Sequence, residues 1–487
     1  MQLRQIPALL RCKPVEASDA AVTGVTEDSR RVRPGWVFVA APGVRTDGHS
    51  YVPQAVAAGA VAVIGDRPGV TAISGVPYLC AENPRRVLGL LAHALAGDPS
   101  KSMTVIGVTG TNGKSSSVLM TQRVLQACGR SAGTIGTLGY DIGGEIVAAP
   151  HTTPFGEDLA ELFRRAKDAG HTHVVMEVSS HALDQDRVAG IDFDVAAFTN
   201  LTQDHLDYHL NMEDYRRAKL KLFESIEGPD RFTVVNRDDP SAPHFMAASR
   251  VACHTYGREG DCRASDVRIR PAGMRFNVLT PWGASEIEMV LLGHHNVSNA
   301  LCAIAICCGL GLPLDRVAKG IASLPIVRGR FERVDAGQDF HVIVDYAHTE
   351  DGLRNVLRAA RAICDKRVIV VFGCGGDRDK TKRPKMACAA AQLADYAVVT
   401  SDNPRTEDPL TIIADIEVGM VESGKKRDAE YLVIPDRAEA IRRTIEMARP
   451  GDLVMIAGKG HEDYQIIGAR RIHFDDVETA RTVLEGR

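Results

Sequence analysis

Short apolar runs alternate with amphipathic stretches along the whole chain, and glycine and proline turns separate them into three blocks. In the first block, apolar runs at 37–40 and 60–64 are followed by a helical stretch over 84–96. The small polar run at 97–100 then predicts a linker to the second block. Strands mixed with helices at this spacing indicate an α/β arrangement.

The second and third blocks repeat the strand-and-helix alternation more regularly. Their predicted strands are 104–108, 173–176, 195–198 and 232–235 in the second block, and 342–344, 368–372, 397–399 and 453–456 in the third. Such alternation is typical of mainly parallel sheets with helices on both faces. We therefore predict an α/β protein of three domains: a small N-terminal α/β domain over 1–100, a central P-loop α/β domain over 101–334, and a C-terminal Rossmann-like doubly wound domain over 335–487.

Composition narrows the classes of partner. A chain of 487 residues is too long for one core, and 45% hydrophobic with 25% charged residues is ordinary for a soluble globular protein. The net charge of -4 argues against a nucleic-acid partner, which usually selects a basic surface. No stretch approaches the roughly 20 apolar residues that span a bilayer, and the start, with Arg4 and Pro7, does not read as a signal peptide. We expect a cytoplasmic protein without membrane insertion.

The eleven cysteines are scattered and form no Cys-x-x-Cys pair. We interpret them as buried thiols in a reducing compartment rather than as disulfides or zinc ligands.

A glycine-rich turn joins the strand at 104–108 to a helical stretch, which is the setting of a phosphate-binding loop. Residues 107–115 read Gly-Val-Thr-Gly-Thr-Asn-Gly-Lys-Ser. Glycines let backbone N–H groups turn toward a phosphate, and the helix N-terminus adds positive partial charge. Lys114 can then reach a terminal phosphate, and Ser115 can bind Mg²⁺. The spacing is looser than the strict motif, because five residues separate Gly107 from Gly113. The turn predicts nucleotide binding, which kinases, GTPases, transport motors and ligases share.

Polar groups that could hold a metal follow two other predicted strands. Glu177 ends the strand at 173–176, and the loop 199–209 contains two aspartates and two histidines. A strand-end carboxylate suits Mg²⁺, although Glu177 could equally be solvated and the loop residues could be hydrogen-bonded turn residues. Zinc is disfavoured because no third histidine or cysteine lies at ligand spacing. From the helical pattern alone, Lys219 is a solvated surface lysine.

Taken together, these residues resemble a known family, the Mur ligases. The resemblance rests on blocks that run in family order from about residue 25 to 465: Gly-Thr-Asn-Gly-Lys-Ser (110–115), Glu-Val-Ser-Ser-His (177–181), Asp-His-Leu-Asp-Tyr-His (204–209), Ala-Lys-x-x-Leu-Phe (218–223), Gly-His-His-Asn-Val-Ser-Asn-Ala (293–300), Gly-Arg-Phe-Glu (329–332) and Asp-Tyr-Ala-His-Thr (345–349).

The resemblance implies a UDP-binding N-terminal domain, a central ATPase and a C-terminal domain that receives an amino acid. It implies that a carboxylate attacks the γ-phosphate of ATP, and that an amine then displaces phosphate from the acyl phosphate. The implied catalytic residues are Lys114, Glu177, His205 and Lys219. The implied ATP-binding residues are Gly110, Thr111, Asn112, Gly113, Lys114, Ser115, Ser116, Asn299 and Arg330. The implied Mg²⁺ ligands are Ser115, Glu177, His205 and Lys219, the last as an N6-carboxylysine, which overrides the solvated interpretation of this lysine.

The amino acid is implied by Asp-Asn-Pro-Arg at 402–405. By pattern alone this is an Asn-Pro turn before a helix. In the family it marks members that add meso-2,6-diaminopimelate, with Arg405 pairing the distal carboxylate that lysine lacks. Arg378 is implied to bind the α-carboxylate, and Gly458 and Glu462 the distal amino group. The implied set is Arg378, Asp402, Asn403, Pro404, Arg405, Gly458 and Glu462.

The implied contacts of the UDP-linked substrate lie in the first two blocks. They are Ser29, Val44, Arg45, Thr46, His151, Thr152, Thr153, Ser179, Gln185 and Arg187. Two positions depart from the family pattern: Ser115 stands where threonine is usual, and Glu350 stands where proline is usual. Serine keeps the hydroxyl, whereas the sequence suggests no role for Glu350.

The expected function is therefore ATP- and Mg²⁺-dependent addition of meso-diaminopimelate to UDP-N-acetylmuramoyl-L-alanyl-D-glutamate, by a monomer, in peptidoglycan precursor synthesis and hence in cell-wall formation, cell shape and division. Three alternatives stay open at this point. They are a lysine-adding relative, a folylpolyglutamate synthase on the same scaffold, and an ATP-dependent binding protein that performs no ligation.

Overall fold

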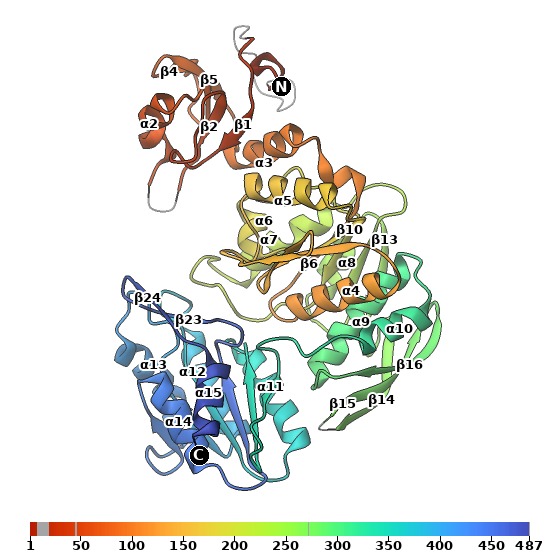
Figure 1. Ribbon diagram of the computed structural model, residues 1–487, viewed down its shortest axis with the longest axis vertical. Coiled ribbons are helices and arrows are strands. Elements are labelled where there is room, and N and C mark those ends of the chain that lie inside the picture. Colours follow the sequence, from red (N-terminus) through yellow and green to blue (C-terminus); the bar gives the residue numbers. More distant parts are fainter. Residues whose placement is uncertain (7–18, 44–45, 271, 487) are drawn as a thin grey trace.

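The computed structural model describes residues 1–6, 19–43, 46–270 and 272–486, which form three α/β bodies (Figure 1). Each body is built on one mostly parallel sheet, and within the described residues these sheets have five, eight and six strands. The N-terminal body lies at the top of Figure 1, the central body in the middle and the C-terminal body at the lower left. The predicted α/β class with three domains is confirmed.

The N-terminal body has the strand order β1-β2-β3-β5-β4. Alternate residues of β2 pack against opposite layers, Val37 and Val39 toward α3 and Phe38 toward α2, which explains why the run at 37–40 is continuously apolar. The elements are η1 (Leu3–Gln5), β1 (Gly24–Thr26), β2 (Trp36–Ala40), η2 (Gly48–Tyr51), α2 (Val52–Ala57), β3 (Ala62–Gly65), β4 (Ala72–Ile73), β5 (Val76–Cys80) and α3 (Pro84–Leu95).

The central body has the order β13-β12-β11-β6-β10-β7-β8-β9, parallel from β13 to β7. In the central strand β6, Ile106 and Val108 pack toward α4 and α9, whereas Val105 packs toward α5 on the other face. The elements are η3 (Pro99–Ser102), β6 (Thr104–Thr109), α4 (Lys114–Ala127), β7 (Ala132–Gly136), β8 (Gly139–Ile142), β9 (Glu145–Val147), α5 (Gly156–Asp168), β10 (His173–Glu177), α6 (Ser180–Asp184), β11 (Val195–Phe198), α7 (Met212–Glu224), β12 (Phe232–Asn236), α8 (Ala242–Ala248), β13 (Ala252–Tyr256), α9 (His294–Gly309) and α10 (Leu314–Ala322).

A three-stranded antiparallel sheet extends the central body, at the lower right of Figure 1. It consists of β14 (Arg263–Arg270), β15 (Gly273–Thr280) and β16 (Gly283–Met289), and β16 packs against α10. None of the predicted strands covers it, although β15 alternates buried and exposed residues with the two-residue period of a half-buried strand.

The C-terminal body has the order β17-β18-β22-β19-β20-β21, parallel except for β17, with helices on both faces. Its first strand begins at Glu332, three residues before the predicted boundary at 335. The elements are β17 (Glu332–Val334), β18 (His341–Asp345), α11 (Glu350–Ile363), β19 (Val368–Phe372), α12 (Lys382–Leu393), β20 (Tyr396–Val399), α13 (Pro409–Glu422), β21 (Tyr431–Val433), α14 (Arg437–Met447), β22 (Leu453–Ala457), the hairpin β23 (Tyr464–Ile467) and β24 (Arg470–His473), and α15 (Asp476–Glu485).

Across the described ranges, no helix combines the length and the apolar character needed to cross a membrane. The cysteines in those ranges are free thiols, and Cys302, Cys307 and Cys308 are buried within α9.

Candidate functional site

A cavity of about 920 Å³ lies between the central and C-terminal bodies. The carboxyl ends of β6, β10 and β11 open into it, as parallel α/β sheets favour for ligand sites. It brings together these predicted residues: Thr111, Asn112, Gly113, Lys114, Ser115, Ser116, Thr152, Glu177, Ser179, His205, Asn299 and Arg330.

The glycine-rich turn can adopt its shape only with glycine at two positions. Gly110 has φ +149° and Gly113 has φ +85°, both outside the range that side chains favour. A Cβ on Gly110 would lie 1.8 Å from Thr199 Oγ1, and one on Gly113 would lie 2.3 Å from Asn299 Oδ1. The turn therefore packs directly against the end of β11 and against α9, with Lys114 at the first position of α4.

Two lysines converge on the same backbone carbonyl. Lys114 Nζ donates to the carbonyl oxygens of Gly110 at 3.0 Å and Thr111 at 2.8 Å, and Lys219 Nζ donates to Gly110 O at 2.8 Å. Lys219 is 1% exposed, and its ammonium lies 4.5 Å from the centre of the Tyr215 ring. Burial, reinforced by the nearby Lys114, holds the pKa of Lys219 well below its ordinary value.

The interpretation of Lys219 as a solvated lysine from the helical pattern is therefore wrong. Helix α7 packs against α6 and β6, and position 219 lies on its buried face, four residues after Tyr215 and three before Leu222. That spacing was the available signal, because residues three and four apart share one face of a helix.

Glu177, Ser115 and His205 each offer an atom that could bind a cation. The Glu177 carboxylate is 2% exposed and accepts from Thr137 N at 2.8 Å and Thr137 Oγ1 at 3.2 Å. Ser115 Oγ accepts from Arg330 Nη2 at 3.0 Å. Burial lowers the pKa of His205 to about 3, so its imidazole is neutral and keeps a lone pair.

This donor set fits Mg²⁺ rather than a fully protein-bound metal. In the part of the chain that the structure describes, no three His, Cys, Asp or Glu side chains are grouped so that they could hold a metal ion by themselves. Magnesium is commonly bound by one or two carboxylates, with water and phosphate oxygens completing its octahedron. A buried carboxylate beside a phosphate-binding loop supplies that arrangement.

Arg330 reaches the phosphate-binding loop from the linker between the two bodies. Its guanidinium lies 4.8 Å from the centre of the Tyr346 ring, and its Nε is a buried donor with no hydrogen-bond partner within the described residues. A buried, unsatisfied cationic donor is costly unless a ligand pairs it. Arg330 can therefore donate a hydrogen bond to an anionic oxygen in this cavity.

Sequence reasoning missed the contribution of the C-terminal body to this cavity. Asp345, Tyr346, His348 and Asp351 line it, and Asn112 Nδ2 donates to Asp351 Oδ2 at 3.0 Å. Asp345 is 6% exposed and accepts from the backbone N–H groups of Phe331 and Ala347. The available signal was the position of Asp345 at the end of the apolar strand β18, as for Glu177 on β10.

Most residues predicted to contact the UDP-linked substrate form one network beside Glu177. Thr153 Oγ1 donates to Glu177 O at 2.9 Å and accepts from Ser179 N at 3.0 Å. Arg187 donates to Thr153 O at 3.1 Å and to Gln185 Oε1 at 2.9 and 2.7 Å. Thr152 and His151 are the other members of this group that lie here. Thr152 Oγ1 lies 3.0 Å from Thr137 Oγ1, and the carbonyl oxygen of His151 accepts from Tyr140.

Ser29 and Thr46 belong to the N-terminal body. Ser29 Oγ donates to Gln54 Oε1 at 3.0 Å, and Thr46 O accepts from Gly43 N at 3.0 Å. The predicted residues Val44 and Arg45 lie outside the described residues.

The residues predicted to bind the amino acid meet at the carboxyl ends of β19, β20 and β22. Asn403 Nδ2 donates to Glu462 Oε2 at 2.8 Å, and a Cβ on Gly458 would lie 2.8 Å from Asp402 Oδ2. Arg405 Nη1 donates to Gly376 O at 2.7 Å. A Cβ on Gly375 would lie 2.8 Å from Arg405 Nη1 and 3.8 Å from Arg378 Cγ, so the two arginines flank one glycine. Burial and the neighbouring Arg378 lower the pKa of Arg405. Two arginines on neighbouring loops suit a ligand with carboxylates.

The backbone of Arg405 is held in an unusual conformation. Its φ is +53°, which costs a non-glycine residue about 1–3 kcal/mol. The hairpin β23–β24 holds it there, because Arg405 N donates to Ile466 O at 3.0 Å and Gly468 N donates to Arg405 O at 2.7 Å. Gln465 Nε2 also donates to Asp402 O at 2.6 Å.

Two buried cations beneath this site were not predicted. Lys459 Nζ lies 3.1 Å from Glu462 Oε2 and 3.8 Å from Asp402 Oδ1. Arg437 donates to both carboxylate oxygens of Asp476, at 2.8 and 2.7 Å, and to the carbonyl of Ala457 at 3.0 Å. These side chains fix the loops that carry the predicted residues.

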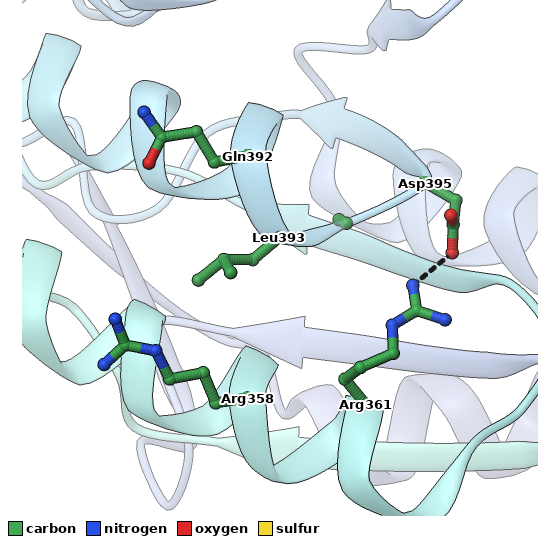
Figure 2. Close-up of a pocket in the computed structure, with 6 residues that line it drawn as sticks. Arg358, Arg361, Gln392, Leu393 and Asp395 are labelled. Carbon is green, nitrogen blue, oxygen red and sulfur yellow. Dashed lines mark hydrogen bonds and ion pairs between the residues drawn. The ribbon is translucent and has the colours of Figure 1, made fainter.

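A second cavity, of about 420 Å³, opens between α11 and α12 (Figure 2). It is lined by Arg358, Arg361, Gln392, Leu393, Ala394 and Asp395, and Arg361 is ion-paired with Asp395. None of the predicted site residues lies in this lining.

Comparisons with known proteins agree with this geometry. Three family models match: the Mur ligase family catalytic domain over 21–94, the Mur ligase middle domain over 108–307, and the Mur ligase glutamate ligase domain over 329–460. The chain is 46% identical over 473 residues to the UDP-N-acetylmuramoyl-L-alanyl-D-glutamate--2,6-diaminopimelate ligase of Geobacillus thermodenitrificans, covering 96% of this chain and 95% of that protein.

Solved structures give the same result. One titled UDP-N-acetylmuramoyl-L-alanyl-D-glutamate--2,6-diaminopimelate ligase matches with a TM-score of 0.70 and 33% identity over 100% of this chain and 99% of that chain. The folylpolyglutamate synthase of Mycobacterium tuberculosis, complexed with ADP, matches with a TM-score of 0.65 and 21% identity over 81% of this chain and 93% of that chain. At this lower identity the likeness concerns the fold alone.

Proposed function

The chain belongs to the Mur ligase family, and we propose that it joins meso-2,6-diaminopimelate to UDP-N-acetylmuramoyl-L-alanyl-D-glutamate at the expense of ATP. Near-full-length relatives carry the diaminopimelate ligase name, which confirms the predicted ligase class. The structural observation that carries the choice of amino acid is the pair Arg378 and Arg405 beside Asn403 and Glu462. A substrate with two carboxylates and a distal amine complements that pair.

The central cavity supplies the groups that activating a carboxylate requires. ATP brings several negative charges, and transfer of its γ-phosphate depends on positioning and on stabilising negative charge. Lys114 and Arg330 are the cations of the cavity that face the phosphate-binding loop. They lower the cost of charge on the transferred phosphate, while backbone N–H groups at the start of α4 orient it.

Mg²⁺ would be held by Glu177, Ser115 and His205, and when bound it would neutralise phosphate oxygens and orient them. The protein prepares this set by fixing each donor. Thr137 binds both oxygens of Glu177, Arg330 donates to Ser115, and burial keeps His205 neutral.

Lys219 is proposed to carry a carbamate. A lysine with a strongly lowered pKa is a neutral amine more often than an ordinary lysine, and only the neutral amine reacts with CO₂. Addition of CO₂ to the neutral amine forms a carbamate anion and releases one proton, and the anion would lie close to Lys114, where burial and Lys114 disfavour a second cation. Bicarbonate-dependent restoration of activity, or ¹³C incorporation from ¹³CO₂ observed at Lys219, tests this modification.

The choice of diaminopimelate over lysine rests on a carboxylate for Arg405. Lysine would leave this guanidinium unpaired in a half-buried site, and such unpaired groups allow strong discrimination. The test is a competition in which diaminopimelate and lysine are offered together at equal concentration. Preference for diaminopimelate is expected, and equal use of lysine would contradict the assignment.

The alternative of ATP hydrolysis without ligation is tested by phosphate release. The proposal requires phosphate release to depend on the UDP-linked dipeptide and the amino acid together. Release at the same rate with ATP alone would instead support a nucleotide-driven binding protein.

A further inference from the structure

One segment of the C-terminal body binds two adjacent residues of the central body through side-chain hydrogen bonds and an ion pair. We call Asp379, Thr381, Lys382 and Lys385, at the start of α12, the α12 clamp. Gln203 Nε2 donates to Asp379 Oδ2 at 2.9 Å and to Thr381 Oγ1 at 2.6 Å, and Lys385 Nζ donates to Gln203 Oε1. Lys382 Nζ donates to Asp204 Oδ1 at 3.1 Å. All four contacts fall on Gln203 and Asp204, so the α12 clamp holds the loop after β11 at one point.

The ion pair in this clamp is buried on both sides. Asp204 is 4% exposed and Lys382 is 5% exposed. Burial opposes the charged form of Asp204, and the Lys382 ammonium, 3.1 Å away, compensates its charge. A buried charge whose partner is withdrawn is strongly unfavourable. Asp204 can therefore keep this position only while Lys382 stays against it.

The residue after Asp204 is the proposed metal ligand His205. Its φ is +56°, in the left-handed region that non-glycine residues rarely adopt and keep only where their surroundings enforce it. On the C-terminal side, the turn that follows fixes it, since His205 O accepts from Tyr208 N at 3.1 Å and from His209 N at 2.9 Å. On the N-terminal side, the clamp on Gln203 and Asp204 fixes it, and this anchor comes from the other body.

The same clamp begins one residue after Arg378, which is proposed to receive the α-carboxylate of the amino acid. Asp379 is 4% exposed and binds Thr381 N and Gln203 Nε2, so the backbone that carries Arg378 is anchored to the central body. Movement of the clamp would displace Arg378 and release the N-terminal anchor of His205 together.

We propose that Lys382 and Gln203 are positioning residues that couple the amino-acid site to the magnesium site, by orienting His205 only while the C-terminal body is docked. This inference rests on the proposed function for the roles of His205 and Arg378. Lys382 and Gln203 touch no substrate in this scheme, and they act through Asp204 and the backbone of His205.

The first test replaces Lys382 by methionine, which keeps the aliphatic stem and removes the charge. Lys382→Met is expected to lower kcat by about 10- to 100-fold, the effect of a catalytic group displaced by about 1 Å. The enhancement of ADP affinity by Mg²⁺ is expected to shrink, while ADP affinity without Mg²⁺ stays unchanged. Small-angle X-ray scattering is expected to give a larger radius of gyration than for the unmodified protein.

Gln203→Ala is the second variant, because Gln203 is only partly buried and its loss leaves no buried charge unpaired. It removes three of the four clamp contacts and is expected to show the same changes to a smaller degree. Lys380→Met is the matched control: Lys380 lies in the same segment, but it pairs with Glu407 inside the C-terminal body and its side chain is 62% exposed. It is expected to leave all three measurements unchanged.

Unchanged Mg²⁺ enhancement and an unchanged radius of gyration in both clamp variants would overturn the proposal. So would a loss of kcat that matches the loss of folded protein alone. If the unmodified protein failed to ligate diaminopimelate, the proposed function would fail, yet ADP binding and scattering would still decide whether the clamp orients the nucleotide side. If Lys382→Met did not fold, Gln203→Ala would decide by the same three measurements.

Discussion

The nucleotide site and the amino-acid site hold their charged side chains in different ways. In the nucleotide site, Lys114 and Ser115 stand next to the glycines that shape their loop, so their positions follow from one contiguous segment that packs against Thr199 and Asn299. In the amino-acid site, Arg405 is held by a hairpin about sixty residues further along the chain, and buried ion pairs fix the loops around it. The phosphate-binding loop of the first site is thus contiguous in the sequence, whereas the loops of the second site are fixed by distant residues that touch no ligand.

Breaking a buried ion pair beneath the amino-acid site gives the largest expected effect. Arg437→Met leaves Asp476 buried and unpaired, and is expected to cost about 3–5 kcal/mol of local stability in the C-terminal body. The Michaelis constant for diaminopimelate should rise with it, because Arg437 also binds the carbonyls of Ser401 and Ala457. Hydrogen exchange of peptides covering 400–405 and 457–462 measures the loss.

Arg442→Met serves as the control, since Arg442 lies on the same helix α14 and pairs with Glu439 and Glu446 at the surface. No measurable change in exchange is expected there. Equal hydrogen exchange in the two variants would show that the Arg437–Asp476 ion pair does not stabilise the loops of the amino-acid site.

Removing a catalytic cation from the nucleotide site should affect the rate and leave the fold intact. Lys114→Met is expected to lower kcat by about 10²–10³-fold, the usual cost of one group that stabilises transferred charge. Hydrogen exchange in the C-terminal body should not change. Steady-state kinetics and hydrogen-exchange measurements on the same variant check these two expectations. Lys101→Met is the control, because Lys101 is exposed and forms an ion pair with Asp98. A loss of stability as large as that of Arg437→Met would remove the distinction between the two sites.

The same difference explains what the sequence could predict. The phosphate-binding loop is contiguous and lies between a strand and a helix, so its residues are visible in a one-dimensional pattern, and Glu177 is visible as the end of an apolar strand. The apolar runs likewise predicted β2, β3, β6, β10, β11, β12, β18, β19, β20 and β22 within a few residues, whereas the remaining strands of the three main sheets were not predicted. The β14–β16 sheet was missed, and its strands carry many exposed charged residues.

The supports of the amino-acid site could not be predicted from pattern. Arg437 and Asp476 are 39 positions apart, and Lys459 meets Asn403 across 56 positions. Arg437, Asp476 and Lys459 each look like an ordinary surface charge on their own segment. Only the packing of α14, α15 and the loop after β22 buries them. Arg405 itself was assigned by family resemblance, since its left-handed backbone depends on a hairpin contact that no local pattern encodes.

Removing Arg405 tests the amino-acid site directly, with a smaller expected effect. Arg405→Ala is expected to raise the Michaelis constant for diaminopimelate by about 10- to 100-fold, the cost of losing a charged hydrogen bond. The Michaelis constant for ATP should not change. Arg405→Lys should restore little, because an ammonium lacks the planar pair of donors.

Arg427→Ala is the control, because Arg427 is exposed and pairs with Glu417 on the outer side of the C-terminal body. If Arg405→Ala raised the Michaelis constants for ATP and diaminopimelate alike, the residue would serve the docking of the two bodies and not the recognition of a carboxylate.

The smallest effect is expected at Glu350, where the chain departs from the proline usual in the family. Glu350 is the first residue of α11, and its carboxylate accepts from Arg354 Nε at 3.0 Å one turn later. Proline is also well suited to a first helical position, and the preceding Thr349 has φ −119° and ψ 161°, which a following proline allows. Glu350→Pro therefore exchanges one favourable helix start for another and loses only an i,i+4 pair, worth about 0.5 kcal/mol or less.

Arg358→Pro, in the middle of the same helix, should cost about 3 kcal/mol. Denaturant unfolding compares the free energies of unfolding of the two variants. A large loss of stability in Glu350→Pro would mean that Glu350 supports the Asn112–Asp351 contact, and hence that the nucleotide site depends on this helix of the C-terminal body.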